Sequence, residues 1–326
     1  MLLPAVTELL ARVARHPAVD QMLESLRRGS KSESLAGLTD PAKALVAAVV
    51  ATELRRPILF LCDTERRAAE TIEPLQFFSR ALGGATVVSL PGLDALPGQG
   101  VGPHPEILGT RAATLWRLAS GQASVVVAPV AATLLSFASR DFYEQLSLTL
   151  ERDQDVSLED VLAHLRRAGY ARADLVEMPG QFAVRGGILD IFPPEAPRPA
   201  RVELLGDTVE SVRAFDPETQ RSTGPLSRIT LPSLTEFPLD GGPEPARDAV
   251  GSEVASEDAL KVPGNGRQSG SSTLFELRDE MLVILDEPAA IERAATQWRA
   301  RLQESAQGRG NSATEEDSDE VSEGTP

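Results

Sequence analysis

The sequence predicts an α/β protein, in which a small α+β domain is inserted into an open parallel sheet. Three short apolar runs rich in Val, Ile and Leu, at residues 57–63, 85–91 and 124–130, are typical of strands buried on both faces. Beyond residue 140 the pattern changes to short strand-like segments, which predict a separate module. These observations predict two structural domains in one chain of 326 residues.

The segments between the apolar runs have the spacing of helices. Residues 64–82 and 105–121 place apolar side chains three and four positions apart, and a glycine closes each segment. A strand–helix–strand order predicts parallel strands with right-handed crossovers. A further apolar run, "MLVIL" at 281–285, runs into another helical segment and is expected to be one more buried strand.

The inserted domain is predicted to contain a helix opened by Ser157, followed by short strands. The segments "ARVELLG" and "TVESVRAF" are separated by the turn dipeptide Gly206-Asp207, which predicts an antiparallel hairpin. A stretch rich in Gly, Pro, Ser and acids predicts a flexible connector. The expected divisions are 1–139 (first part of the α/β domain), 140–230 (inserted α+β domain), 231–238 (return strand), 239–272 (flexible linker), 273–303 (returning strand and helix) and 304–326 (disordered acidic tail).

The charge balance argues against a nucleic-acid surface. The chain has 32 Lys and Arg against 48 Asp and Glu, a net charge of −16, which repels a phosphate backbone. We interpret three pairs of adjacent arginines as solvated helix faces, because acidic residues surround them. These pairs are Arg55-Arg56, Arg66-Arg67 and Arg166-Arg167. We therefore expect a protein partner, and no detectable duplex DNA binding at physiological salt.

Composition also bears on compartment and cofactors. The single cysteine, Cys62, excludes an intramolecular disulfide and is expected to pack in the core. The three histidines (His16, His104 and His164) lie far apart, so no metal site and no cofactor are expected. The sequence contains no run of about 18 apolar residues and no secretory leader pattern, so we expect a cytoplasmic protein that does not associate with a membrane.

Residues 37–44, "GLTDPAKA", have the outline of a phosphate-binding loop without its working parts. Gly37 and Lys43 hold the positions of the first glycine and the lysine in G-x-x-x-x-G-K-[ST]. Alanines (Ala42 and Ala44) replace the second glycine and the Mg²⁺-binding hydroxyl, and Asp40 adds a negative charge where phosphate would lie. The alternative is an ordinary loop followed by a helix with proline in its first turn.

A second element of a nucleotide site lies far along the chain. In "MLVILDEP", Asp286 and Glu287 follow a buried apolar run, which is the form of a Walker B segment. A buried strand that ends in acids before a helix is also common without any nucleotide. Taken with the loop at Gly37 and Lys43, the pattern suggests a degenerate nucleotide-binding fold that cannot position a triphosphate.

Three long motifs carry a resemblance to a known family. They are "LPGLDALPGQGVGPHPEILGTRAATLWRL" (90–118), "MPGQFAVRGGILDIFP" (178–193) and "RVELLGDTVESVRAFDPETQRS" (201–222). The chain resembles the N-terminal UvrB-homologous module of bacterial transcription-repair coupling factor (Mfd), over about residues 5–238 and 272–300. UvrB is the alternative, but UvrB would have an intact P-loop and an aromatic-rich hairpin, and this chain has two Tyr.

The resemblance implies a degenerate RecA-like P-loop domain with a parallel sheet and an inserted UvrA-binding domain. It implies recruitment of UvrA in transcription-coupled nucleotide excision repair, and no ATPase activity in this segment. RNA polymerase and DNA would be partners only through a C-terminal part that is missing here, so we expect a fragment of a longer protein. The alternative is a UvrB-like or helicase-type domain with weak ATP binding or hydrolysis.

The alternation of side chains along "RVELL" separates a core face from an outer face. Arg201, Glu203 and Leu205 are predicted on one face, and Val202 and Leu204 on the other. The first set forms a charge pair beside an apolar residue. Without the family, the simplest interpretation is a solubilising cross-strand pair.

The resemblance assigns this outer face to UvrA. Arg185, Arg201 and Glu203 match positions that contact UvrA in the family, and Leu205 matches a position that is Phe in some members. Arg185 follows the strand "QFAV" and precedes a glycine pair, so its guanidinium is expected to project from the surface. Replacing Arg185 or Arg201 by alanine is expected to leave stability nearly unchanged, as for most exposed positions.

Overall fold

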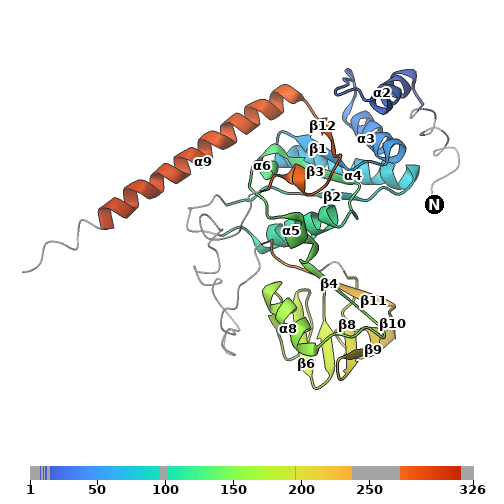
Figure 1. The fold of residues 1–326 in the computed structure, drawn as a ribbon, viewed down its shortest axis with the longest axis vertical. Helices are drawn as coiled ribbons and strands as arrows, with labels where there is room; N and C mark the ends of the chain where they lie inside the picture. Colours follow the sequence, from blue (N-terminus) through green and yellow to red (C-terminus); the bar gives the residue numbers. More distant parts are fainter. Residues whose placement is uncertain are drawn as a thin grey trace, which may run out of the picture. The chain divides into compact units, whose positions relative to one another are not determined.

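The chain forms two compact units, each with its own sheet and core (Figure 1). The computed structural model describes residues 8, 10, 12, 15–95, 102–194, 196–236 and 272–316, with the backbone alone described beyond residue 303. The first unit comprises residues 1–107, 117–140 and 263–326, and the second comprises residues 108–116 and 141–262. The second unit is therefore inserted in the sequence of the first, which confirms the predicted fold class.

The first unit is built on a four-stranded parallel sheet. Its strands are β1 (Ile58–Cys62), β2 (Val87–Ser89), β3 (Val125–Pro129) and β12 (Leu282–Leu285). Their order is β12-β1-β3-β2, and each neighbouring pair is parallel. Every residue of β1 and β3 is buried, because helices cover both faces of a parallel sheet.

Helices alternate with these strands along the chain. Up to residue 144 they are α2 (Pro17–Arg27), α3 (Asp40–Leu54), α4 (Glu65–Leu82), α5 (Pro105–Ala119), α6 (Val130–Thr133) and α7 (Arg140–Glu144). Local sequence sets the ends of α4. The Thr64 side chain accepts a hydrogen bond from the Arg67 amide, and Gly83 ends the helix with a φ of 146°. One apolar core joins α3, α4 and β1, and Phe60 and Leu75 lie at its centre.

The last strand leads into a long helix. Strand β12 is followed by α9 (Pro288–Glu316), and a short 3₁₀ turn, η2 (Leu274–Glu276), precedes the strand. We expected structure to end at residue 303 and an acidic tail to follow. Residues 304–316 are instead helical, although Gly308 and Gly310 lie in this segment and glycine disfavours a helix interior. The rest of the expected tail, 317–326, lies outside the described residues.

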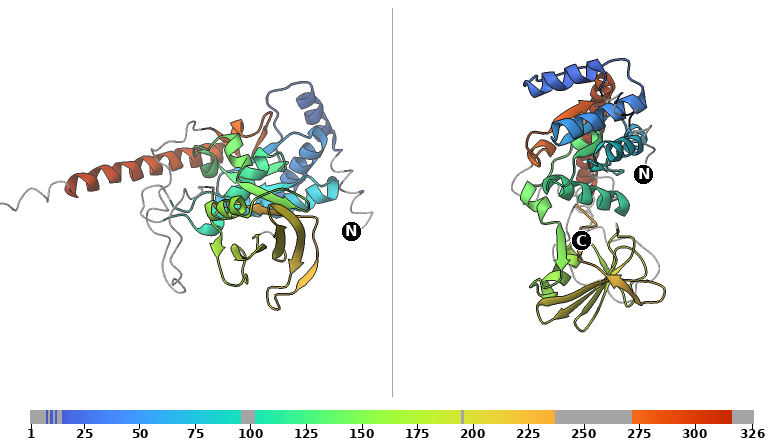
Figure 2. Two further views of the ribbon diagram at one scale, coloured as in Figure 1. Left: turned by 60° about the horizontal axis from the view of Figure 1, so that its bottom comes forward. Right: turned by 90° about the vertical axis from the view of Figure 1, so that its right-hand side faces the viewer.

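The second unit consists of a six-stranded sheet, a two-stranded sheet and helix α8. The six-stranded sheet has the order β10-β9-β8-β7-β6-β5, is antiparallel except at the β5–β6 pair, and twists strongly in the views of Figure 2. The elements are β4 (Ser147–Glu151), α8 (Leu158–Arg167), β5 (Ala171–Arg172), β6 (Gln181–Arg185), β7 (Ile188–Ile191), β8 (Ala200–Leu205), β9 (Thr208–Phe215), β10 (Ser222–Pro225) and β11 (Arg228–Pro232).

Two local predictions in this unit are confirmed. Ser157 caps α8, and its hydroxyl accepts a hydrogen bond from the Asp160 amide at 3.0 Å. Strands β8 and β9 form the expected hairpin, in which Leu205 pairs with Thr208 and Gly206 has a φ of 64° at the turn. A glycine adopts that left-handed conformation without strain.

The main core of the second unit lies between one face of the sheet and α8. Val161 and Leu165 of the helix are fully buried there. Val202 and Leu204 of β8 belong to the same core, so the predicted inward face of this strand is confirmed. The opposite face of the sheet carries a much smaller apolar cluster around Phe215.

The end of the inserted domain differs from the expectation. Strand β11 pairs antiparallel with β4, with Leu231 opposite Leu148, so it does not return to the parallel sheet at residue 231. The next residues stay in the second unit, where the Leu234 amide donates to the Ala168 carbonyl. Strand β10 was also not predicted, because its sequence "STGP" has no apolar alternation. The expected linker, residues 239–272, lies outside the described residues except at Ser272.

Two further expectations concern Cys62 and the membrane. Cys62 packs in the core, as predicted, and burial raises the pKa of its thiol to about 12. Among the described helices, none combines the length and the apolar character needed to cross a membrane.

A fully buried ion pair holds the end of the second unit. Helix α5 contributes residues 108–116 to this unit, and the Arg111 guanidinium lies against the Glu236 carboxylate. One contact joins Arg111 Nη2 to Glu236 Oε2 at 3.1 Å, and the side chains are only 1% and 3% exposed. A buried charge needs such a partner, so the pair fastens the segment that leaves β11.

We expect single and double replacements of this pair to have opposite effects. Arg111→Met or Glu236→Leu alone removes one half of the buried ion pair and should lower the free energy of unfolding by about 3–5 kcal/mol. The double variant removes both charges and should recover most of that loss. Urea unfolding followed by Trp116 fluorescence, in a Trp298→Phe background, reports on this unit. A double variant as unstable as the singles would contradict the interpretation.

Candidate functional site

The structure brings the separated parts of the degenerate nucleotide site together. Lys43, in the first turn of α3, lies against the two acids that follow β12. Its Nζ is 2.6 Å from Asp286 Oδ1 and 2.7 Å from Glu287 Oε1. Gly37 precedes α3 with a φ of 75°, a conformation that suits glycine. The contact between Lys43 and Asp286 joins residues 243 positions apart in the sequence.

Arg67 completes this site and was not singled out from the sequence. Its Nε is 2.8 Å from Asp286 Oδ2, and its Nη1 is 2.7 Å from Asp40 Oδ2. We interpreted Arg66-Arg67 as a solvated face; this holds for Arg66, which pairs with exposed Glu70, and is wrong for Arg67. Arg67 could have been identified from its position in the first turn of the helix after β1, because that turn lies at the carboxyl end of the sheet, where the other charged residues lie.

These five side chains form what we call the charge cluster: Asp40, Lys43, Arg67, Asp286 and Glu287. Hydrogen bonding to Arg67 lowers the pKa of Asp40. Burial lowers the pKa of Lys43, but its bonds to Asp286 and Glu287 outweigh burial and raise the pKa overall. The Arg67 pKa is raised by its bonds to Asp40 and Asp286. Lys43 and Arg67 therefore stay cationic, and the cluster places these two side chains against three carboxyl groups.

The charge cluster does not fit a magnesium–triphosphate ligand. The lysine that would hold phosphate oxygens is already bound to two carboxylates, and Asp40 occupies the start of α3, where phosphate binds in a working loop. Ala44 has no hydroxyl for Mg²⁺. Residues 30–39 contain no strand, whereas a P-loop follows one directly.

The second candidate site lies on the outer face of the six-stranded sheet. Arg185, Ile188, Glu203 and Ser211 form a row across β6, β7, β8 and β9, because each is paired with the next. Leu205 follows on the same face of β8. The predicted alternation is confirmed, since Arg201 and Glu203 are partly exposed, whereas Val202 is fully buried.

Arg201 is tied into the fold more tightly than the sequence indicated. Its Nε and Nη2 lie 2.7 Å and 2.8 Å from the two Asp190 carboxylate oxygens, and its guanidinium stacks over the Phe215 ring at 5.0 Å. The Asp190 side chain is 6% exposed, and hydrogen bonding to it raises the pKa of Arg201. Replacing Arg201 by alanine would leave the buried Asp190 carboxylate without this cation. The prediction of unchanged stability is therefore wrong for Arg201.

Glu203 and Arg185 have weaker partners. Glu203 does not pair with Arg201; its Oε2 accepts from the Ser211 hydroxyl at 2.6 Å and lies 3.8 Å from Arg213 Nη2. Arg185 is exposed at the end of β6, as expected, and Nη2 donates to the Asp174 carbonyl at 2.6 Å. Both side chains keep hydrogen-bonding capacity on the outer face.

Two apolar side chains accompany these charges. Leu205 is 74% exposed and Ile188 is 38% exposed. Ile188 was not identified from the sequence, although it alternates with the inward Leu189 and shares a face with Asp190. We call Arg185, Ile188, Glu203 and Leu205 the outer-face patch.

Comparison with known protein families identifies this unit. Residues 148–237 match the UvrB interaction domain family. The second unit carries a UvrB interaction domain. The match begins in β4 and continues past β11, and it includes every strand that contributes to the outer-face patch.

Known proteins with similar sequences agree with this assignment. The transcription-repair-coupling factor of Myxococcus xanthus is 30% identical over 310 residues, which cover 85% of this chain and 26% of that protein. The transcription-repair-coupling factor of Bacillus subtilis (strain 168) is 29% identical over 216 residues, 66% of this chain and 18% of that protein. The UvrABC system protein B of Thermosipho africanus (strain TCF52B) is 26% identical over 230 residues, 68% of this chain and 35% of that protein.

These similarities confirm the resemblance to the UvrB-homologous module of transcription-repair coupling factors. They also relate the chain to proteins of DNA repair. The chain spans about a fifth to a quarter of the two coupling factors, 18% and 26% of their lengths.

We expect the charge cluster to stabilise the first unit. Lys43→Met or Arg67→Met removes one hydrogen-bonded cation from Asp286, which is 1% exposed, and should lower the free energy of unfolding by about 1.5–3 kcal/mol. Arg66→Met, at a neighbouring arginine in an exposed pair with Glu70, is the control and should leave the free energy of unfolding nearly unchanged. Urea unfolding followed by Trp298 fluorescence, in a Trp116→Phe background, measures both. Equal effects at Arg66 and Arg67 would contradict this role.

Proposed function

We propose that this chain acts in nucleotide excision repair by recruiting UvrA through its second unit. The observation that carries the proposal is the UvrB interaction domain at residues 148–237. Similarity to transcription-repair-coupling factors over 85% of the chain supports a role in coupling repair to transcription. Any contacts with RNA polymerase and DNA would then belong to the remainder of a longer protein, and the net charge of −16 agrees with a protein partner for this segment.

The outer-face patch supplies the contact surface in this proposal. Its apolar side chains, Ile188 and Leu205, are exposed to solvent. Burying them against a partner would add a favourable hydrophobic term to the binding free energy. Arg185 and Glu203 lie beside them and carry opposite charges. Charged groups around an apolar centre fix orientation and exclude wrong partners.

Arg201 has a different role from its neighbours in this proposal. Its guanidinium already satisfies Asp190, and the side chain is 19% exposed. In this role Arg201 holds β8 against β7 and so fixes the positions of Glu203 and Leu205 on the outer face. Its direct contribution to UvrA binding is limited to the edge that remains exposed.

Three substitutions separate contact from support. Arg185→Ala should weaken UvrA binding by about 2–5 kcal/mol, or about 30-fold and more, with an unchanged melting temperature, because it removes one partner of a desolvated charge contact. Arg201→Ala should lower both the affinity and the melting temperature. Arg228→Ala, at an exposed arginine of the other sheet, is the matched control and should change neither.

Isothermal titration with purified UvrA gives the affinities, and calorimetry gives the melting temperatures. If Arg185→Ala and Leu205→Asp both bind UvrA like the unaltered chain, the outer-face patch is not the contact surface. Val202→Asp tests the core side of the same strand. It should unfold the unit, because Val202 is fully buried.

We also propose that the chain does not hydrolyse ATP. The support is the charge cluster, in which Lys43 is held by two carboxylates and Asp40 lies at the start of α3. The alternative, a UvrB-like or helicase-type domain with weak hydrolysis, would require all of these contacts to open. No specific observation favours it.

A steady-state ATPase assay with Mg-ATP tests this proposal. We expect phosphate release no faster than in the absence of protein, for the unaltered chain and for Glu287→Gln alike. The comparison with Glu287→Gln excludes a contaminating ATPase. Turnover above background that disappears in Glu287→Gln would overturn the proposal.

A further inference from the structure

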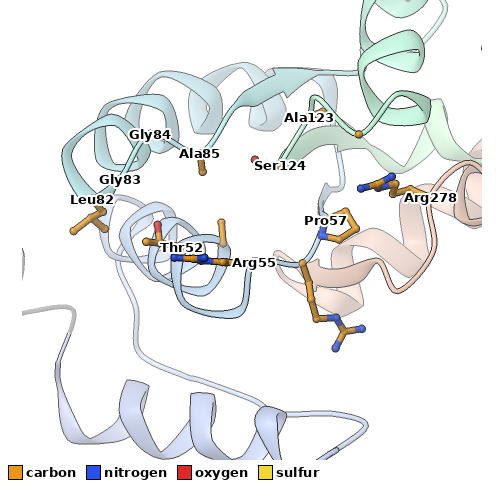
Figure 3. A pocket seen from close by; sticks show the side chains of 13 residues that line it. Thr52, Arg55, Pro57, Leu82, Gly83, Gly84, Ala85, Ala123, Ser124 and Arg278 are labelled. Atoms are coloured by element: carbon orange, nitrogen blue, oxygen red, sulfur yellow. The ribbon is translucent and has the colours of Figure 1, made fainter. Parts of the chain in front are cut away.

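A pocket of about 580 Å³ lies at the amino ends of the parallel strands of the first unit (Figure 3). It is bordered by the end of α3, the start of β1, the start of β3 and Arg278 before β12. The charge cluster follows the carboxyl end of β12, so the pocket lies at the opposite edge of the sheet. Its volume is within the range of about 300–1,000 Å³ that is usual for small-molecule sites.

Among the described residues that line this pocket, three are arginines and none is acidic. They are Arg55, Arg56 and Arg278. Within the part of the chain that the structure describes, none of the three forms an ion pair with a carboxylate. Our interpretation of Arg55-Arg56 as a solvated helix face among acids is therefore incomplete, because both residues border the pocket. Three cations without a carboxylate partner are concentrated in a chain whose net charge is −16, and one of them, Arg56, donates from Nε to the Glu280 carbonyl at 3.0 Å.

The end of α3 accounts for part of this charge. Carbonyl groups at a helix C-terminus carry partial negative charge and favour a nearby cation, which explains a basic residue such as Arg55 after α3. Arg55 nevertheless has a φ of 50°, where glycine is the usual residue. Arg278 follows only the three-residue 3₁₀ turn η2, which is too short for the aligned peptide dipoles of an α-helix, so the same argument does not explain it.

Arg278 is held in place by a glycine. A Cβ atom on Gly121 would lie 2.9 Å from Arg278 Nη2 and 3.1 Å from Cζ, so the guanidinium packs on the bare backbone of that residue. Gly121 also has a φ of 74°, which disfavours other residues. In Figure 3, Arg278 points into the pocket, and Arg55 borders it from α3.

The other groups of the pocket complement these cations. Ser124 Oγ accepts from the Thr86 amide at 3.3 Å and can still donate its own proton. Leu82 and Pro57 supply apolar contacts. Guanidinium groups bind phosphate oxygens through paired N–H donors, which is stronger than a neutral hydrogen bond. We propose that this pocket binds a phosphorylated small molecule, with Arg55 and Arg278 as the phosphate ligands.

Titration calorimetry of the full chain tests the proposal with two probes, inorganic pyrophosphate and AMP. Binding of pyrophosphate alone identifies a bare phosphate site, and binding of both identifies a site for nucleotides; either result supports the proposal. Arg278→Gln and Arg55→Gln should each weaken binding by about 10- to 100-fold, the effect of losing a charge-assisted hydrogen bond. Arg80→Gln, an exposed arginine of α4 outside the pocket, should have no effect.

Failure of this proposal is distinguishable from failure of the UvrA proposal. The titrations do not involve the second unit, and Arg278→Gln should bind UvrA like the unaltered chain. Lys43→Met separates the pocket from the charge cluster and should leave probe binding unchanged. Absence of binding for both probes at millimolar concentration would overturn the proposal, as would binding that is lost in Lys43→Met and retained in Arg278→Gln.

Discussion

The buried carboxylate of Asp286 is the constraint on which the first unit depends. It lies at the end of β12, which returns to the sheet after the whole second unit has intervened in the sequence. Its two cations come from α3 and α4, 243 and 219 residues earlier in the chain. A carboxylate that is 1% exposed is tolerable only if such partners face it, so β12, α3 and α4 must assemble together. This requirement restricts the register of the edge strand β12 more than apolar packing alone would. Apolar packing is a weak constraint on this strand, because Val283 and Leu285 on one of its faces are exposed.

The same contacts explain how a nucleotide-like outline is compatible with a role in protein recruitment. In a working P-loop the lysine is available to phosphate, and the loop supplies free amide donors. Here Lys43 and Arg67 donate hydrogen bonds to Asp286, and Arg67 also donates to Asp40. The charged groups that would bind a ligand therefore stabilise the fold instead. The lysine and the aspartate of that outline instead stabilise each other through their contact at 2.6 Å. In our proposal, recruitment belongs to the inserted unit, whose outer face has exposed side chains.

Features of the fold that depend on local sequence could be predicted, and those that depend on distant partners could not. The strands β1 and β3 are continuous apolar runs, and Gly206-Asp207 fixes a hairpin within a few residues. The pairing of β11 with β4 joins segments about eighty residues apart, which explains why the division at residue 230 was misplaced. Site residues follow the same rule. Arg185 and Leu205 are exposed as the strand period indicated, whereas the link between Arg201 and Asp190 depends on how β7 pairs with β8.

The arginines of this chain divide by whether a carboxylate within the fold satisfies them. Arg67, Arg111 and Arg201 each face a buried or nearly buried acid, and removing any of them leaves an anion that the interior cannot solvate. Within the described ranges, Arg185 bonds only to a carbonyl oxygen, and the pocket that Arg55 and Arg278 border has no acidic lining residue. Sequence alone does not separate these groups, because the acids that Arg67, Arg111 and Arg201 contact lie elsewhere in the sequence. The partner of each arginine in the folded structure determines its group. Arginines of the second group can bind a ligand or another protein through their charge without weakening the fold.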